Sequence, residues 1–261
     1  MPARLARLIK NNMDAFIKEF SIILFIFCTN IVSLLFLPSV SQAYLFSGER
    51  TPEEIAKKHG WAVVSVTSYD KDDNPLVVGS GFIVARRGML NVNQYYDVKK
   101  VVTNYHCIKG ATTARIRLTN GDYYDVVGVL GVDQDWDIAV LKIMARRVPG
   151  APLGNSDKLS VGERVVAIGN PQGLENTVSE GVISAIRGRE GTGGTIIQFT
   201  APISQDSSGG PLFNTKGKVV GVTTLYLKEG QNLNLAVPIN RVKPLLKGIK
   251  SVALTEVAKE R

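Results

Sequence analysis

The sequence predicts an all-β protein made of short antiparallel strands. Segments rich in β-branched residues recur along the chain, and turn signals such as TNGD, NPQG and NTKGK separate them. No helical pattern long enough to cross between parallel strands lies among them, and 25 glycines in 261 residues favour tight turns. About a dozen such segments indicate β-sandwiches or β-barrels.

Residues 52–60 predict a short N-terminal helix ahead of the first strand. Thr51 is placed to be the N-cap, Pro52 occupies the first helical position, and Gly60 provides the stop. The alternating, β-branched run at 61–69 then predicts the first strand.

The later strands are predicted from the same composition, each with a turn signal beside it. They cover residues 76–85, 101–106, 114–119, 123–130, 137–143, 164–170, 176–186, 195–200, 211–214, 218–227 and 234–239. Residues 151–163 form the candidate junction between two β halves. The segment 239–250 predicts a short amphipathic helix that closes the chain.

Residues 1–43 form a leader that is left out of the fold. Basic residues precede an 18-residue apolar run at 20–37, and the small-residue stretch SVSQA ends at Ala43. This order is typical of a cleaved secretory signal peptide. The alternative is an uncleaved membrane anchor, because a run of this length can span a bilayer. Both readings place the protein outside the cytoplasm, in the periplasm, the cell envelope or the extracellular space.

The composition excludes some functions. Cys28 lies in the leader, so Cys107 stands alone in residues 44–261 and cannot form an intramolecular disulfide there. The net charge of +8 falls to +6 without the four basic and two acidic leader residues. The excess is spread thinly with no interleaved aromatic residues, so we expect no nucleic-acid site. No His, Cys, Asp and Glu cluster has metal-ligand spacing, so neither metal nor cofactor is expected.

Serine catalysis needs an imidazole to take the proton and a carboxylate to orient the imidazole. The two histidines are His59, at the end of the predicted helix, and His106, at the end of the predicted strand VVTNYH. The carboxylate candidates are Asp133, Asp135 and Asp137, of which Asp137 directly precedes an apolar strand. A lone histidine or a turn aspartate is more often structural, so these residues alone do not establish catalysis.

The stretch ISQDSSGGPLFN, residues 203–214, supplies the candidate nucleophile. Two glycines after Ser208 allow a tight turn and close substrate approach, whereas Ser204 and Ser207 lack this support. The backbone N–H groups of Asp206 and Ser208 are placed to stabilise a developing oxyanion. We therefore assign Ser208 as the nucleophile.

The sequence as a whole resembles a known protein family. The motifs TNYH at 103–106, DIAVL at 137–141 and SSGGPL at 207–212, in this order, are similar to the His, Asp and Ser motifs of trypsin-like serine proteases. The HtrA/Deg branch is the closer match, through VVGSGFIV, AIGNPQGLENTVSEGVISAIRG, IIQFTAPIS and LNLAVPINRVKPLL. The resemblance runs from about residue 52 to 246.

This resemblance implies two perpendicular six-stranded antiparallel β-barrels with His106, Asp137 and Ser208 in the cleft between them. It departs from the family pattern where Asp206 replaces the usual glycine before the serine pair, and where residues 86–100 form a longer segment, expected to be a surface loop. Cys107 lacks the usual strand partner and is expected to be a small buried residue. No PDZ domain, which many relatives carry, is expected.

The resemblance also implies a substrate pocket. In such folds the residue six positions before the nucleophile lies at the pocket base, which here is Pro202, followed by Ile203. Thr224, Leu225 and Tyr226 are expected along the pocket wall. An acidic residue at the bottom of the pocket would select Lys or Arg before the cut. Because Pro202 stands there, this pocket predicts cleavage after small or medium apolar residues.

These observations predict an exported serine endopeptidase that acts on unfolded or damaged polypeptides. The alternative is a protease-fold protein that binds exported polypeptides without cutting them, as a holdase or adaptor, and Asp206 is its best support. Relatives often form trimers through N-terminal segments. The apolar residues of AYLFSGER, 43–50, could serve a homotrimer here.

Overall fold

The computed structural model describes residues 21, 24–25, 48–85, 97–146, 148–170, 177–189, 191, 193–226, 233–248 and 250–257. Contacts divide the chain into two units, Met1–Glu49 and Arg50–Arg261. Apart from residues 21 and 24–25, the predicted leader and its apolar run lie outside the described residues, and so does most of segment 43–50. Among the helices of the described part, none combines the length and apolar character needed to cross a membrane.

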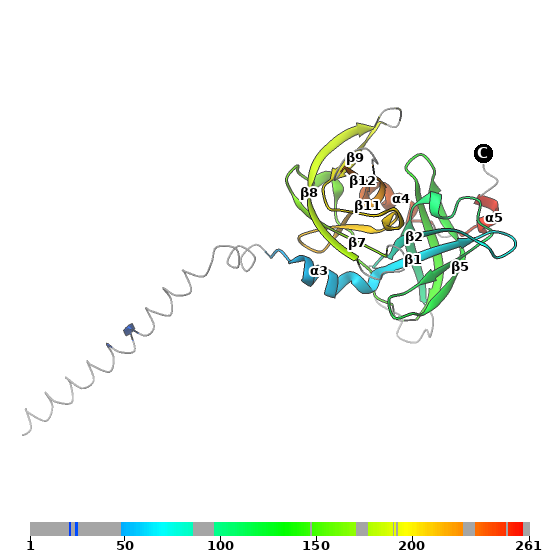
Figure 1. The fold of residues 1–261 in the computed structure, drawn as a ribbon, viewed down its shortest axis with the longest axis horizontal. Coiled ribbons are helices and arrows are strands. Elements are labelled where there is room, and N and C mark those ends of the chain that lie inside the picture. The colour runs from blue at the N-terminus through cyan, green and yellow to red at the C-terminus, as the bar shows by residue number, and fades with distance from the viewer. Residues whose placement is uncertain are drawn as a thin grey trace, which may run out of the picture. The chain divides into compact units, whose positions relative to one another are not determined.

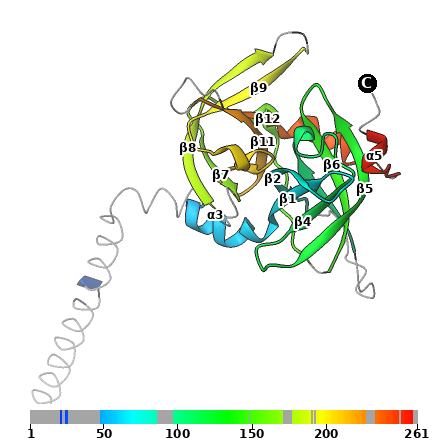
Figure 2. The same cartoon turned by 45° about the vertical axis from the view of Figure 1, so that its right-hand side comes forward.

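The second unit folds into two closed β-barrels of six strands each (Figure 1; Figure 2). The first contains β1 (Val63–Tyr69), β2 (Pro75–Ile83), β3 (Asp97–Thr103), β4 (Thr113–Arg117), β5 (Tyr123–Asp133) and β6 (Ile138–Ala145). The second contains β7 (Arg164–Gly169), β8 (Thr177–Arg189), β9 (Gly194–Phe199), β10 (Pro211–Asn214), β11 (Val219–Tyr226) and β12 (Asn234–Pro238).

Strand order around the barrels is β1-β2-β3-β6-β5-β4 and β10-β11-β12-β9-β8-β7, and neighbouring strands run antiparallel. The predicted all-β fold of two six-stranded barrels is therefore confirmed. Each of the twelve described strands is paired on both sides, so closure removes the free edges of these two sheets.

Three apolar clusters hold the barrels together. One fills the first barrel around Val64 and Val66, and one fills the second around Ile197 and Phe199. The third contains residues of both barrels, including Phe82 of β2 and Phe213 of β10. This third cluster joins the two barrels.

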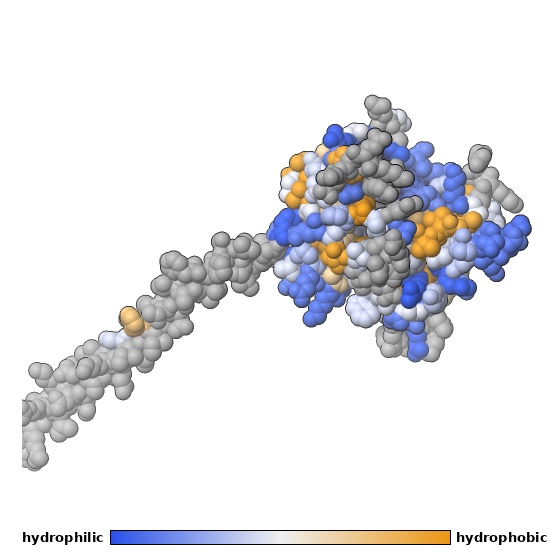
Figure 3. Space-filling view, in the orientation of Figure 1, coloured by the Kyte–Doolittle hydropathy of each residue, from blue (hydrophilic) through white to orange (hydrophobic). Residues whose placement is uncertain are grey.

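On the face drawn in Figure 3, apolar side chains form small groups among polar ones.

The predicted N-terminal helix is α3 (Pro52–His59). The Thr51 hydroxyl accepts the N–H of Glu54 at 3.2 Å, and the Glu54 carboxylate accepts the N–H of Thr51 at 3.0 Å, which is a capping box. Ile55 of this helix is fully buried. The predicted cap, first residue and stop at Gly60 are confirmed.

The connection between β6 and β7 bonds to both barrels. Ala151, the first residue of the predicted junction, donates its N–H to the carbonyl of Ile83 in the first barrel at 2.8 Å. Gly154 donates to the carbonyl of Val219 in the second barrel at 2.7 Å. These bonds tie the start of the connection to β2 and β11.

Several predicted boundaries are wrong, and the main differences lie in three places. The strand expected at 101–106 ends at Thr103, because the N–H of Tyr105 donates to the carbonyl of Asp137 and the chain turns. Residues 97–100 of the expected loop belong to β3 and pair with β6, while residues 86–96 lie outside the described part. The last predicted helix is shorter, α4 (Ile239–Leu245), and a further helix α5 (Leu254–Val257) follows.

Thr51→Ala should lower the free energy of unfolding by about 1 kcal/mol, because it leaves an N–H group of the first turn of α3 without its side-chain acceptor. Urea titration followed by circular dichroism measures this change. Thr51→Ser, which keeps the hydroxyl, serves as the control and should cost much less. Equal losses in both variants would contradict the capping role.

Candidate active site

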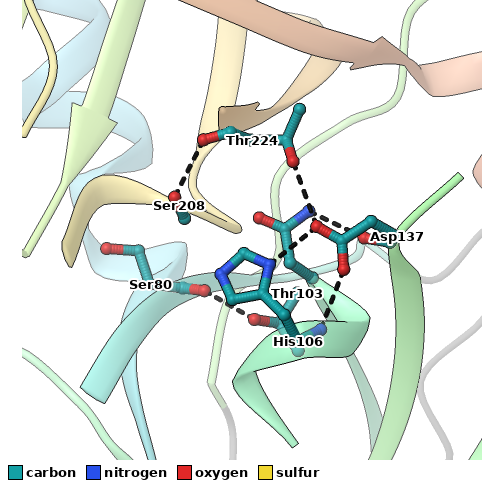
Figure 4. Close-up of polar contacts among 7 residues, drawn as sticks. Ser80, Thr103, His106, Asp137, Ser208 and Thr224 are labelled. Atoms are coloured by element: carbon teal, nitrogen blue, oxygen red, sulfur yellow. Dashed lines mark hydrogen bonds and ion pairs between the residues drawn. The ribbon is translucent and has the colours of Figure 1, made fainter. Parts of the chain in front are cut away.

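The residues of the predicted triad lie in three turns. His106 lies in the 3-10 turn Tyr105–Cys107 that follows β3, and Asp137 directly precedes β6. Ser208 follows the 3-10 turn Gln205–Ser207 and precedes β10. Two of the side chains thus come from the first barrel and one from the second, and Figure 4 shows the three in one group.

Asp137 has a left-handed backbone with φ of +54°. Aspartate adopts this region more readily than most residues, but the conformation still carries strain. Its N–H donates to the carbonyl of Gln134 at 3.2 Å. Its carbonyl accepts the N–H of Tyr105 at 3.1 Å and the side-chain amide of Asn104 at 2.8 Å. These bonds secure the turn against the strain.

The carboxylate of Asp137 makes three bonds. Oδ1 accepts the backbone N–H of His106 at 2.8 Å, and Oδ2 lies 2.7 Å from His106 Nδ1. Oδ2 also accepts the Thr224 hydroxyl at 3.1 Å. A carboxylate beside Nδ1 favours the tautomer with a proton there. The other ring nitrogen of His106, Nε2, is then the one that can accept a proton.

The same pair sets the charge of the imidazole. The hydrogen bond to Asp137, with a smaller contribution from the Cys107 side chain, raises the pKa of His106 from 6.5 to about 10, and partial burial opposes the rise. The imidazole therefore has a proton on both nitrogens and a positive charge at neutral pH. It becomes an available base only as the pH rises and Nε2 loses its proton.

Ser208 and His106 are not hydrogen-bonded to each other in the described structure. The Ser208 hydroxyl donates to the carbonyl of Thr224 at 2.9 Å, and the residue is 8% exposed. Figure 4 shows the hydroxyl directed at this carbonyl, with the imidazole on another side. The three residues thus lie in one site, with the Ser208 hydroxyl bonded to Thr224 and not to His106.

Ser80 of β2 holds the Ser208 turn from the opposite barrel. Its hydroxyl donates to the carbonyl of Asp206 at 2.7 Å and accepts the N–H of Asn170 at 3.0 Å. Its N–H donates to the carbonyl of Ser208 at 2.8 Å, and its carbonyl accepts the Thr103 hydroxyl at 2.7 Å. Ser80 is fully buried, so each bond replaces one that water would otherwise make.

Gly209 lets the turn approach β2 this closely. Its φ is +89°, and a Cβ there would collide with the carbonyl oxygen of Ser80 and lie 2.6 Å from the Thr103 hydroxyl. The N–H of Gly209 donates to the carbonyl of Thr223 at 2.8 Å. Only glycine fits both the backbone angle and the space.

One predicted oxyanion donor, Asp206, belongs to the 3-10 turn Gln205–Ser207, and the other, Ser208, directly follows it. In this turn the N–H of Ser207 donates to the carbonyl of Ser204 at 3.0 Å, and the Asp206 carbonyl is held by Ser80. Such turns direct N–H groups at carbonyls three residues back along the chain.

A cavity of about 410 Å³ lies beside the turn. Pro202 and Ile203, two of the residues expected in a substrate pocket, line it together with Ala167, Ile168, Gly169, Thr177, Ser179, Ser204, Ser207 and Thr223. Thr223 is the residue of β11 in this lining, and its neighbour Thr224 contacts Asp137 and Ser208. Leu225 and Tyr226 belong to β11, and their side chains lie outside the described part.

Three site residues escaped the sequence reasoning: Ser80, Asn104 and Trp136. The sequence predicts Thr224 along the pocket wall, but not its bond to the Asp137 carboxylate. Ser80 stands between two glycines in GSG, which signals close backbone approach, but its partner turn is far away in the sequence.

His59 takes no part in the site, because it stacks on Phe213 at 5.4 Å between ring centroids. Within the described residues, no group of three or more His, Cys, Asp and Glu side chains could hold a metal ion.

Paired six-stranded antiparallel barrels of this order define the trypsin-like class. The family model described as the trypsin-like peptidase domain matches residues 79–222, more than half of the chain. The chain therefore belongs to the trypsin-like peptidase family, and its relatives are serine proteases of the HtrA/Deg type.

Three comparisons illustrate the relationship. Mitochondrial serine protease HTRA2 of Bos taurus is 37% identical over 179 residues, 66% of this chain and 36% of the relative. A Chlamydia trachomatis relative, whose name describes a DegP-like periplasmic serine endoprotease, is 41% identical over 152 residues, 57% of this chain and 28% of the relative. The solved HtrA-type protease AlgW with a tripeptide matches with a TM-score of 0.64 and 28% identity, covering 76% of this chain and 62% of that one.

The chain spans less than half the length of the curated relatives that it matches, with 37% and 41% for two of them.

The imidazole of His106 should titrate far above 6.5, and Asp137→Asn should lower its pKa, because the amide cannot stabilise the charged ring. NMR of the ring protons over pH 5 to 11 measures both midpoints. His59, whose pKa is lowered chiefly by burial, is an internal control and should not respond.

The stability should follow the same titration. Because the folded pKa of His106 lies above 6.5, its contribution to the free energy of unfolding is complete below pH 6.5 and is lost as the pH rises to about 10.

In the NMR titration, an equal midpoint for His106 in the wild type and in Asp137→Asn would contradict the pairing of His106 with Asp137.

Proposed function

We propose that the protein is a serine endopeptidase that cleaves polypeptides through an acyl-enzyme. The carboxylate–imidazole pair of Asp137 and His106, 2.7 Å apart beside a serine on a glycine-backed turn, carries this proposal. Ser208 attacks the peptide carbonyl, and His106 takes the hydroxyl proton and returns it to the leaving amine. Asp137 keeps the ring in the required tautomer.

The proposed reaction requires a local rearrangement. Ser208 must leave the carbonyl of Thr224, and the Gln205–Ser207 turn must reorient so that the N–H groups of Asp206 and Ser208 face the oxyanion. Substrate binding in the adjoining cavity can supply the free energy for this change. Because His106 is protonated at neutral pH, activity should rise toward alkaline pH.

The cavity beside the turn supports a preference for apolar residues before the cut. None of the residues described as lining it is charged, and Pro202 and Ile203 form one side. Each buried CH₂ group gains about 0.8 kcal/mol, whereas a buried substrate charge would have no partner. Small and medium apolar side chains such as Val, Ala, Leu and Ile fit best. Because these are mostly buried in folded proteins, the proposed substrates are unfolded or damaged chains.

The proposed setting is outside the cytoplasm, with residues 1–43 as a cleaved leader or a membrane anchor and 44–261 as the protease domain. The order of basic, apolar and small residues in the leader supports this, and the Chlamydia trachomatis relative is named as periplasmic. A homotrimer joined through residues 43–50 is the proposed assembly.

A holdase or adaptor that binds polypeptides without cutting them is the second candidate. Asp206 in place of glycine in the oxyanion turn favours it, as does the Ser208 hydroxyl bonded to Thr224 instead of His106. It would use the same apolar cavity. The two candidates differ in whether Ser208 reacts.

A fluorophosphonate probe should label the wild-type protein at Ser208 in the presence of an unfolded protein, and Ser208→Ala should neither label nor degrade that protein. Ser207→Ala is the matched control and should still be labelled. Any residual turnover in Ser208→Ala should be on the order of 10⁶-fold below that of the wild type, too slow to detect as degradation. Binding of unfolded protein by both proteins, with no label or cleavage in either, would favour the holdase.

Cleavage-site profiling on a denatured proteome should give apolar residues before the cut. Pro202→Asp places a carboxylate on the cavity wall and should shift the profile toward Lys and Arg, because their charge then finds a partner. Mass spectrometry of the products measures both profiles. A wild-type profile dominated by Lys or Arg would contradict the proposed pocket.

A further inference from the structure

Trp136, the residue before Asp137, is enclosed by two arginines of the second half of the chain. The guanidinium carbon of Arg189, at the end of β8, lies 4.7 Å from the indole ring, and that of Arg241, in α4, lies 4.5 Å from it. Trp136 is only 4% exposed. Trp136, Arg189 and Arg241 are named here the Trp136 stack. Two cations within 6 Å of one indole are each attracted by its π face.

The first residue of β9 closes the same site. A Cβ added at Gly194 would lie 2.6 Å from the Trp136 ring and would collide with the Arg241 side chain. The backbone of β9 therefore lies directly against the indole. The ring belongs to the core cluster that joins the barrels, with Ile138 and Val242 among its members. A side chain of the first barrel is thus held by β8, β9 and α4.

The turn that contains Trp136 also contains Asp137, whose backbone has the strained left-handed conformation. Between Asp133 and Asp137, Trp136 is the one buried residue, so it anchors this turn to the core. Its N–H donates to the carboxylate of Asp133 at 3.0 Å. A left-handed aspartate persists only where its surroundings over-determine it. The buried indole therefore holds the turn of residues 133–137 in place by packing into the core.

We propose that Trp136, held between Arg189 and Arg241, is a positioning residue that keeps the Asp137 carboxylate in bonding distance of His106. The proposal rests on the function proposed above and extends it to residues that touch neither substrate nor reacting atoms. The end of β8 and the helix α4 thereby set the geometry of a carboxylate that belongs to the first barrel.

The first test compares Trp136→Leu with the wild type. Loss of the ring lets the turn relax, so kcat should fall by about 100-fold with little change in KM, as expected for a displacement of about 1 Å. The midpoint of the pH profile should move down toward 6.5, because the bond to Asp137 is the largest cause of the raised pKa. Asp137 and Cys107 are the titratable groups that act on the imidazole.

Two variants serve as controls. Trp136→Phe keeps an aromatic face for the arginines and should recover most of the midpoint and the rate. Trp61, the other tryptophan of the chain, is 57% exposed, so Trp61→Leu should change neither. A loss of stability alone would reduce the active fraction without moving the midpoint.

A second readout does not need activity. The chain has two histidines, so the NMR titration of His106 can be followed in every variant against His59. Arg189→Gln and Arg241→Gln remove one cation each and should lower the midpoint of His106 by less than Trp136→Leu. They also keep the test open if Trp136→Leu does not fold.

The outcomes separate the two proposals. A wild type that cleaves nothing and takes no fluorophosphonate overturns the proposed function, while the His106 midpoints still decide the role of the Trp136 stack. If Trp136→Leu folds and keeps the wild-type midpoint, the positioning role is overturned. If that variant does not fold, unchanged midpoints in both arginine variants overturn it.

Discussion

The bonds of Ser80 are the constraint on which the geometry of the site depends. Its hydroxyl and backbone link β2 of the first barrel to the carbonyls of Asp206 and Ser208 in the second. The same residue accepts the N–H of Asn170, so loss of its hydroxyl would remove one hydrogen bond from Asp206 and one from Asn170. Each such bond contributes about 0.5–1.5 kcal/mol. Because β2 pairs with β3, this link sets the Ser208 turn relative to the segment that carries His106.

Thr224 makes the second link across the site. Its hydroxyl donates to the Asp137 carboxylate at 3.1 Å, and its carbonyl accepts the Ser208 hydroxyl at 2.9 Å. One residue of β11 thus steadies the carboxylate and holds the serine away from His106. Release of Ser208 need not disturb the pair of Asp137 and His106, because the two bonds of Thr224 involve different atoms.

Local chemistry explains what could be predicted from the sequence. The cap at Thr51, the stop at Gly60 and the strand segments follow from neighbouring residues, and the structure confirms them. The resemblance of the motifs placed His106, Asp137 and Ser208 in one site, and the structure brings them together. Where the prediction of local structure is wrong, a distant bond is the cause. The strand before His106 ends at Thr103 because Tyr105 bonds to Asp137, 32 positions away in the sequence.

The sequence by itself determined the class of fold, the order of the strands along the chain and the residue types of the candidate site, because these depend on side-chain periodicity and short motifs. Only the tertiary structure decided the direction of the Ser208 hydroxyl, the bond from Ser80 to the Asp206 carbonyl and the packing of Trp136 against Arg189 and Arg241. The bonds of Ser80 and the packing of Trp136 join residues from both halves of the molecule, and the bond of Ser208 joins the turn before β10 to β11 of the second barrel. The contacts between the halves arise when two closed sheets pack together, and no local sequence pattern encodes that packing.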